Sequence, residues 1–308
     1  MKLVFLGTPD FACKPLEAIY ESNHEILAVV TQPDKPVGRK AIITPCAVKS
    51  LAISKGLKTL SYNKIRLEGI EDLKALNPDI MVTCAYGQIL SKEILDIPKY
   101  GIINIHASLL PKYRGAAPIQ WSIINGDKIT GVTIMQTQEG IDTGDIIMQE
   151  ELEIGKTETA GELFDRLSNL GASMIVKALD TIESGKAVYK KQDESKATKV
   201  GMIKKEDGKI NFNDTANNIV NLIRGLNPWP IAFTKYDNKT LKIYSAVECD
   251  LKGNAGEVLA SDLSSGLIIA TGDKSISVLE LQLEGSKRMG IKDFLIGRKL
   301  PVGYKFGE

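Results

Sequence analysis

Short apolar runs alternate with amphipathic segments through the first half of the 308-residue chain. The apolar runs predict strands at residues 2–6, 26–31, 59–61, 80–84 and 102–105. These runs lack polar alternation, which is typical of strands that are buried on both faces. The segments between them predict helices at residues 15–22, 45–55, 69–76 and 91–97. This repetition predicts an α/β domain with a Rossmann-like, mostly parallel sheet and right-handed crossovers.

The chain then continues with a helical pattern at residues 119–125 and two strand-like runs at 131–136 and 145–152. We expect these two runs to form a late hairpin on the same sheet. Residues 159–184 carry apolar side chains at helical spacing and predict a long helix that ends near Gly185.

The composition changes between residues 185 and 205, where seven lysines stand against Asp193 and Glu194. This segment has few large apolar side chains and predicts an exposed basic linker. Beyond it, a helical stretch at 216–226 precedes five short β-like runs with turn residues between them. These runs predict a small OB-like barrel. The predicted organisation is a Rossmann-like catalytic domain at 1–188, a basic linker at 189–205 and an OB-like domain at 206–308.

Composition and charge narrow the functional classes. The formal net charge is +1, so any polyanion must be bound by a local patch. The four cysteines show neither a CxxC pair nor zinc-type spacing, so we expect no metal. Gly7-Thr8-Pro9-Asp10 lacks the GxGxxG spacing, and there is no Walker A motif, so we expect no NAD, FAD or ATP. No signal peptide is evident, and no apolar run reaches the ~18 residues of a membrane span, so we expect a cytoplasmic location without a membrane partner.

The most informative residues are Asn104 and His106, at the end of a predicted central strand. Side chains two apart in a strand point the same way, so both should face one space. Asn104 offers a fixed hydrogen-bond donor, and His106 can move a proton near neutral pH, which suits acyl-type chemistry at a carbonyl carbon. A glycine-bracketed turn, Gly140–Gly144, carries Asp142, whose carboxylate can accept a hydrogen bond from an imidazolium or a bound water.

These motifs resemble a known family. Asn-x-His-x-Ser-Leu-Leu-Pro at 104–111, followed by Gly-Ile-Asp-Thr-Gly-Asp at 140–145, is similar to the pattern of the 10-formyltetrahydrofolate-dependent formyltransferases. Three further segments, 4–12, 31–39 and 224–230, resemble the methionyl-tRNA formyltransferase branch of that family. The resemblance covers essentially the full chain, including the second domain.

The resemblance implies transfer of the formyl group of 10-formyltetrahydrofolate to the α-amine of methionine on initiator tRNA. It implies a catalytic trio of Asn104, His106 and Asp142. His106 could shuttle the proton or donate to the oxyanion, and the sequence leaves both roles open. The residues implied to bind folate are Ser108, Leu109, Leu110, Pro111, Tyr86, Gly87, Gln88 and Ile89. The residues implied to bind tRNA are Lys35, Arg39, Lys40 and Arg114.

The sequence departs from the family pattern at two places. After Arg39 the loop continues Lys-Ala-Ile-Ile-Thr, which is less basic than in relatives, and Ile231 stands where Gly is common after Trp-Pro. Two alternatives stay open. One is a related formyltransferase or hydrolase that acts on a sugar nucleotide or water, and the other is a non-enzymatic oligonucleotide-binding protein. Basic and acidic residues are equal in number from 206 to 308, which argues against the second. We expect a monomer.

Overall fold

The computed structural model describes residues 1–38, 41–298 and 300–307. The chain forms two compact units. The first unit contains residues 1–115, 129–153 and 164–200, and the second contains 116–128, 154–163 and the chain from residue 201 onward. Among the described residues, no helix combines the length and the apolar character that crossing a bilayer requires.

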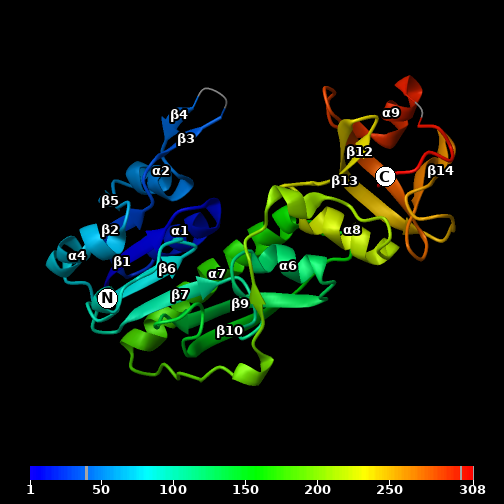
Figure 1. Ribbon diagram of the computed structural model, residues 1–308. Coiled ribbons are helices and arrows are strands. Elements are labelled where there is room, and N and C mark those ends of the chain that lie inside the picture. Colours follow the sequence, from blue (N-terminus) through cyan, green and yellow to red (C-terminus); the bar gives the residue numbers. More distant parts are fainter. Residues whose placement is uncertain (39–40, 299, 308) are drawn as a thin grey trace. The chain divides into compact units, whose positions relative to one another are not determined.

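The first unit is built on a seven-stranded sheet in the order β10-β9-β7-β6-β1-β2-β5 (Figure 1). Its five parallel strands are β1 (Lys2–Gly7), β2 (Glu25–Thr31), β5 (Thr59–Ser61), β6 (Ile80–Cys84) and β7 (Ile102–His106). Two antiparallel strands, β9 (Ile129–Gln136) and β10 (Ile146–Glu153), extend the sheet beside β7. The mostly parallel α/β sheet and its late hairpin are therefore confirmed.

Helices cover both faces of this sheet, as the buried apolar runs of β1, β2 and β6 require. They are α1 (Cys13–Tyr20), α2 (Ala47–Ser54), α3 (Ile65–Glu68), α4 (Ile70–Leu76), α5 (Lys92–Leu95) and α7 (Ala160–Glu183), with a 3₁₀ turn, η1 (Asp10–Ala12), before α1. On one face, Val4 and Leu6 of β1 share a core cluster with Leu73 of α4 and Ile94 of α5.

On the opposite face, α7 lies close to the sheet at Gly171. A Cβ added to this glycine would lie 3.0 Å from the side chain of Ile105 on β7. The missing side chain therefore lets the helix backbone approach the strand that carries Asn104 and His106.

Some short elements were not predicted from the sequence. Residues 34–45, expected as a loop, contain a hairpin of β3 (Lys35–Val37) and β4 (Ile42–Thr44). Another pair, β8 (Arg114–Gly115) and β11 (Lys199–Val200), joins segments far apart in the chain. Strands of two or three residues are too short to show an alternating pattern, so periodicity cannot reveal them.

The second unit contains an antiparallel sheet in the order β12-β13-β16-β15-β14, as expected for the OB-like part of the fold. Its strands are β12 (Ala232–Tyr236), β13 (Lys239–Cys249), β14 (Val258–Asp262), β15 (Gly266–Ala270) and β16 (Ser275–Leu283), with β17 (Met289–Gly290) paired to β16. The helices of this unit are α6 (Pro118–Ile124), α8 (Ala216–Gly225) and α9 (Ile291–Gly297). Two further 3₁₀ turns are η2 (Glu194–Lys196), in the first unit, and η3 (Lys205–Gly208), in the second.

The C-terminal segment connects the two outer strands of this sheet. The amide of Val258 in β14 donates to the carbonyl oxygen of Tyr304 at 2.8 Å. The amide of Phe306 donates to the carbonyl oxygen of Gly256 at 2.9 Å. The ring of Tyr304 also lies 5.0 Å from the ring of Tyr236 in β12, in an edge-to-face arrangement. The segment thereby joins β14 to β12 through backbone bonds and aromatic packing.

Candidate active site

Asn104 and His106 lie at the carboxyl end of β7, the edge at which parallel sheets place ligands. β7 pairs with β6 on one side and with β9 on the other, so the strand is fixed laterally. His106 is only 6% exposed, and Asn104 is partly buried. A buried imidazole needs hydrogen-bond partners, and the loops around it supply them.

The His106 ring is contacted at both nitrogens. Its Nε2 lies 2.9 Å from the carbonyl oxygen of Tyr113, and its Nδ1 lies 3.7 Å from Oδ2 of Asp142. A carbonyl oxygen can only accept a hydrogen bond, so Nε2 carries a hydrogen. Nδ1, on the side of Asp142, is therefore the nitrogen that can take up or release a proton.

Asp142 comes from the loop between β9 and β10, which brings it beside His106. Its Oδ2 also accepts a hydrogen bond from the amide of Gly115 at 2.8 Å. The bracketing Gly144 allows the loop to pass close to β9, because a Cβ there would lie 1.7 Å from the carbonyl oxygen of Gln136. The predicted trio is thus brought together within the first unit.

Asn104 is oriented by a neighbour that sequence reasoning missed. Thr83 pairs with Asn104 across β6 and β7, and its hydroxyl donates to the Asn104 Oδ1 at 2.9 Å. Because the oxygen of the amide is engaged, its two N–H groups are left to donate elsewhere. The sequence predicted that these strands belong to one parallel sheet, but it did not predict the register that sets Thr83 beside Asn104.

The loop at 108–111 is folded by its own polar groups. Ser108 is fully buried, and its hydroxyl donates to the carbonyl of Lys112 at 2.6 Å. The amide of Leu110 donates to the Thr133 hydroxyl at 3.1 Å. The Leu110 side chain forms a small apolar cluster with Met135 and Ile146, and Met135 is the register partner of Asn104 on β9. Leu109 and Pro111 are partly buried in the same loop.

The segment at 86–89 follows β6. Tyr86 is buried, its hydroxyl has no hydrogen-bond partner in the described structure, and burial raises the pKa of this phenol, so the hydroxyl keeps its hydrogen. Gln88 is used structurally, because it accepts from the Ile65 amide and donates to the Tyr62 carbonyl. Gly87 has φ +79°, and Ile89 is exposed.

The four residues implied to bind tRNA differ in their surroundings. Lys35 is exposed on β3 and donates to the Gln32 side chain at 3.0 Å, whereas Arg39 and Lys40 lie outside the described residues. Arg114 is only 2% exposed, and its guanidinium donates to the side chains of Glu194 and Gln192. A phosphate contact needs an accessible guanidinium, so this geometry does not favour the tRNA contact that we predicted for Arg114.

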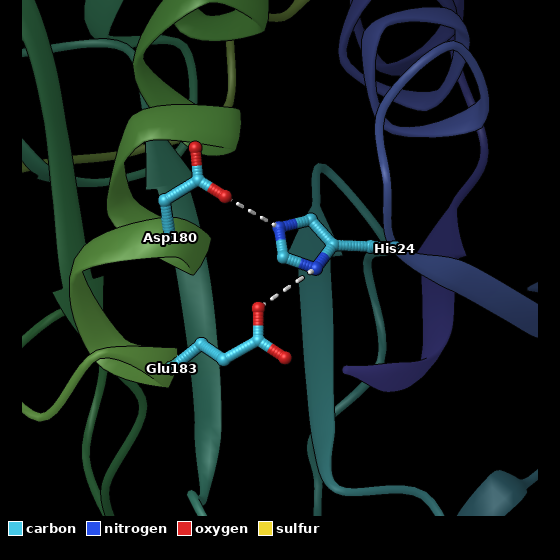
Figure 2. Close-up of side chains that lie close together, drawn as sticks. All are labelled: His24, Asp180 and Glu183. Atoms are coloured by element: carbon cyan, nitrogen blue, oxygen red, sulfur yellow. Dashed lines mark ion pairs between the residues drawn. The ribbon is translucent and has the colours of Figure 1, made fainter.

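One cluster away from this edge joins His24 to two acids of α7 (Figure 2). Nε2 of His24 lies 3.2 Å from Oδ1 of Asp180, and Nδ1 lies 3.8 Å from Oε2 of Glu183. Figure 2 shows the carboxylates approaching opposite edges of the ring. A metal ion binds one ring nitrogen of a histidine, whereas here the two carboxylates face opposite nitrogens, so we interpret the cluster as polar contacts that tie α7 to the start of β2. The residues are too far apart in sequence for spacing to reveal them.

Comparison with known proteins gives matches along most of the chain. The family model for formyl transferase matches residues 1–179, and that for the formyl transferase C-terminal domain matches residues 202–299. A methionyl-tRNA formyltransferase from Lachnospira eligens is 46% identical over 100% of both chains. One from Caldanaerobacter subterraneus is 46% identical over 98% of this chain and 99% of the relative.

Solved structures share the fold. The N-formyltransferase from Helicobacter canadensis, solved with folinic acid and dTDP-3-aminofucose, has a TM-score of 0.69 and 23% identity. The match covers 90% of this chain and 99% of that one. With two family models along its length and close relatives over its whole length, the chain belongs to the formyl transferase family, in its methionyl-tRNA formyltransferase branch.

Proposed function

We propose that this enzyme transfers the formyl group of 10-formyltetrahydrofolate to the α-amine of methionine on initiator tRNA. The observation that carries the proposal is the meeting of Asn104, His106 and Asp142 at one sheet edge, in a chain whose full-length relatives are methionyl-tRNA formyltransferases. The enzyme uses a folate co-substrate, and its acceptor is a tRNA.

Residues beside the trio fit a folate. The pterin ring is flat and carries several hydrogen-bonding groups, so it needs apolar contacts and polar partners together. The cluster of Leu110, Met135 and Ile146 supplies an apolar surface next to Asn104. The segment at 86–89 follows the neighbouring strand β6, whose Thr83 is the register partner of Asn104. We propose that the loops at 108–111 and 86–89 hold the folate.

Asn104 is proposed to stabilise the charge that develops on the formyl oxygen. Attack of the amine on the formyl carbon forms the new C–N bond and leaves negative charge on that oxygen. The amide N–H groups of Asn104 can donate to it because Thr83 holds the amide oxygen. One preorganised donor of this kind contributes about 2.7–4 kcal/mol to lowering the barrier.

His106 is proposed to move the proton. The attacking amine must lose a proton, and the folate nitrogen must gain one as its bond to the formyl carbon breaks. Nδ1 of His106 can serve in this exchange, or can donate to the oxyanion, because Nε2 stays bonded to the Tyr113 carbonyl. The Asp142 carboxylate lies 3.7 Å from Nδ1, the nitrogen proposed to exchange the proton.

We propose that tRNA is bound by local charge rather than by the net charge of the chain. Lys35 on the exposed β3–β4 hairpin is a candidate, together with Arg39 and Lys40, which follow it in the sequence. We also propose that residues 1–188 carry the catalytic domain and that 206–308 form an OB-like tRNA-binding domain. Most of the connecting segment at 189–205 lies within the first unit, up to residue 200, and residues 116–128 and 154–163 lie in the second. We further propose that the protein acts as a monomer in the cytoplasm, where charged tRNA is used.

A second candidate acceptor is a sugar nucleotide, because the Helicobacter canadensis structure contains dTDP-3-aminofucose. The deciding experiment supplies radiolabelled 10-formyltetrahydrofolate with three acceptors: charged initiator tRNA, charged elongator methionine tRNA and a dTDP-aminosugar. We expect label on the initiator tRNA, with much less on the elongator. Label on the aminosugar, or formate released to water at the same rate without tRNA, would refute the proposal.

Substitution of the trio should remove catalysis without unfolding the protein. We expect Asn104→Ala to lower kcat by about 10²–10³-fold and His106→Ala by about 10²–10⁴-fold. Asn169→Ala, an exposed asparagine on α7, is the matched control and should keep normal turnover. Near-normal turnover in either trio variant would remove that residue from the mechanism.

Binding of tRNA should weaken with salt if lysines contact phosphates. We expect log K to fall linearly with log salt, and Lys35→Ala to reduce the slope by about 1. Lys14→Ala, which removes a surface lysine paired with Glu17, should leave the slope unchanged. Equal slopes for all three proteins would exclude Lys35 from the interface.

A further inference from the structure

Residues 190–200, which we call the strap, are bound to the loops of the active site. The backbones of Lys190 and Ile146 exchange two hydrogen bonds of 2.8 and 2.9 Å. At the other end of the strap, Lys199 and Val200 pair in parallel with Arg114 and Gly115. A segment whose composition indicated an exposed linker is therefore joined at both ends to the first unit.

Gln192 bonds the strap to the Asp142 loop. Its Nε2 donates to the carbonyl of Asp142 at 2.8 Å and to that of Gly144 at 2.7 Å. Its Oε1 accepts from Nε and Nη2 of Arg114 at 3.0 and 2.8 Å. Both donors of the amide and its oxygen are therefore used, and the side chain has no free orientation left.

Arg114 bonds to two residues of the strap, Gln192 and Glu194. Its buried guanidinium also donates to both carboxylate oxygens of Glu194, at 2.9 and 2.6 Å. This contact holds the pKa of the Glu194 carboxyl below its ordinary value, although the side chain is 72% exposed. A planar guanidinium that bonds two neighbouring side chains in this way limits the movement of both.

The strap contacts the backbone of the two residues that orient His106. Asp142, with φ +53°, faces the ring at Nδ1, and Tyr113, with φ +61°, accepts from Nε2. Non-glycine residues rarely adopt this left-handed conformation, and they persist in it only where surrounding contacts hold them. Gln192 supplies such a contact to Asp142, and the hydroxyl of Thr198 accepts from the Tyr113 amide at 2.8 Å.

We propose that Gln192 and Thr198 are positioning residues for the transfer reaction, which hold Asp142 and Tyr113 so that His106 keeps its orientation. Neither side chain is assigned a contact with the reacting atoms. The proposal rests on the function proposed above, and it gives Arg114 a role within the protein in place of a phosphate contact.

Three substitutions test the proposal. Gln192→Glu keeps an acceptor for Arg114 but sets a carboxylate oxygen against two carbonyl oxygens. Thr198→Val removes the hydroxyl at nearly constant shape. We expect Gln192→Glu and Thr198→Val each to lower kcat by about 10- to 100-fold, because small misplacements of catalytic groups have effects of this size. KM for tRNA should stay nearly unchanged. Thr198→Ser keeps the hydroxyl and should restore kcat.

Ser195→Ala is the control, because Ser195 lies on the same strap and its hydroxyl bonds only to Asp193 among the described contacts. A second measurement needs no substrate: hydrogen exchange at the amides of Tyr113 and Gly115. Exchange should become faster in Gln192→Glu and Thr198→Val, but not in Ser195→Ala.

Unchanged kcat in both variants, or a Thr198→Ser enzyme as slow as Thr198→Val, would overturn the proposal. If the wild-type enzyme formylates no methionyl-tRNA, the proposed function fails, and hydrogen exchange still decides the role of the strap. Faster exchange in the two variants would then support it, and unchanged exchange would contradict it.

Discussion

The site depends on one buried ring that is held from two sides. His106 is only 6% exposed, and a buried imidazole without hydrogen-bond partners would be costly. The Tyr113 carbonyl engages Nε2, and the Asp142 carboxylate faces Nδ1. Because one nitrogen is committed to the backbone, proton exchange is confined to the other. The orientation of the ring and its chemistry therefore follow from the same two contacts.

The two other functional side chains are fixed by different means. Asn104 depends on sheet register, because Thr83 on the adjacent strand engages its amide oxygen. Asp142 lies on a loop, and loops need bracing if they are to place a catalytic group accurately. The bonds from Gln192 and from the Gly115 amide supply that bracing. A rigid sheet and a braced loop thus meet at the carboxyl edge of β7.

The sequence allowed the parallel sheet, the long helix and the three residues of the trio to be predicted, because strand burial and local motifs carry those signals. Residues that act across the chain could not be predicted. Gln192 reaches Asp142, which lies 50 positions earlier in the chain. The lysine-rich composition around Gln192 indicated only an exposed segment. The resemblance implied that Arg114 binds tRNA, but its guanidinium is buried and bonds to Gln192 and Glu194, which no local pattern connects to it.

The most direct test of this account is to find which nitrogen of His106 carries the hydrogen. The chain has two histidines, so ¹⁵N-histidine labelling gives few signals, and a His24→Asn variant assigns them. We predict that the neutral ring of His106 carries its hydrogen on Nε2, the nitrogen that faces the Tyr113 carbonyl. A neutral ring with its hydrogen on Nδ1 and a bare Nε2 would contradict the account, because Nε2 would then have no hydrogen to donate to the Tyr113 carbonyl.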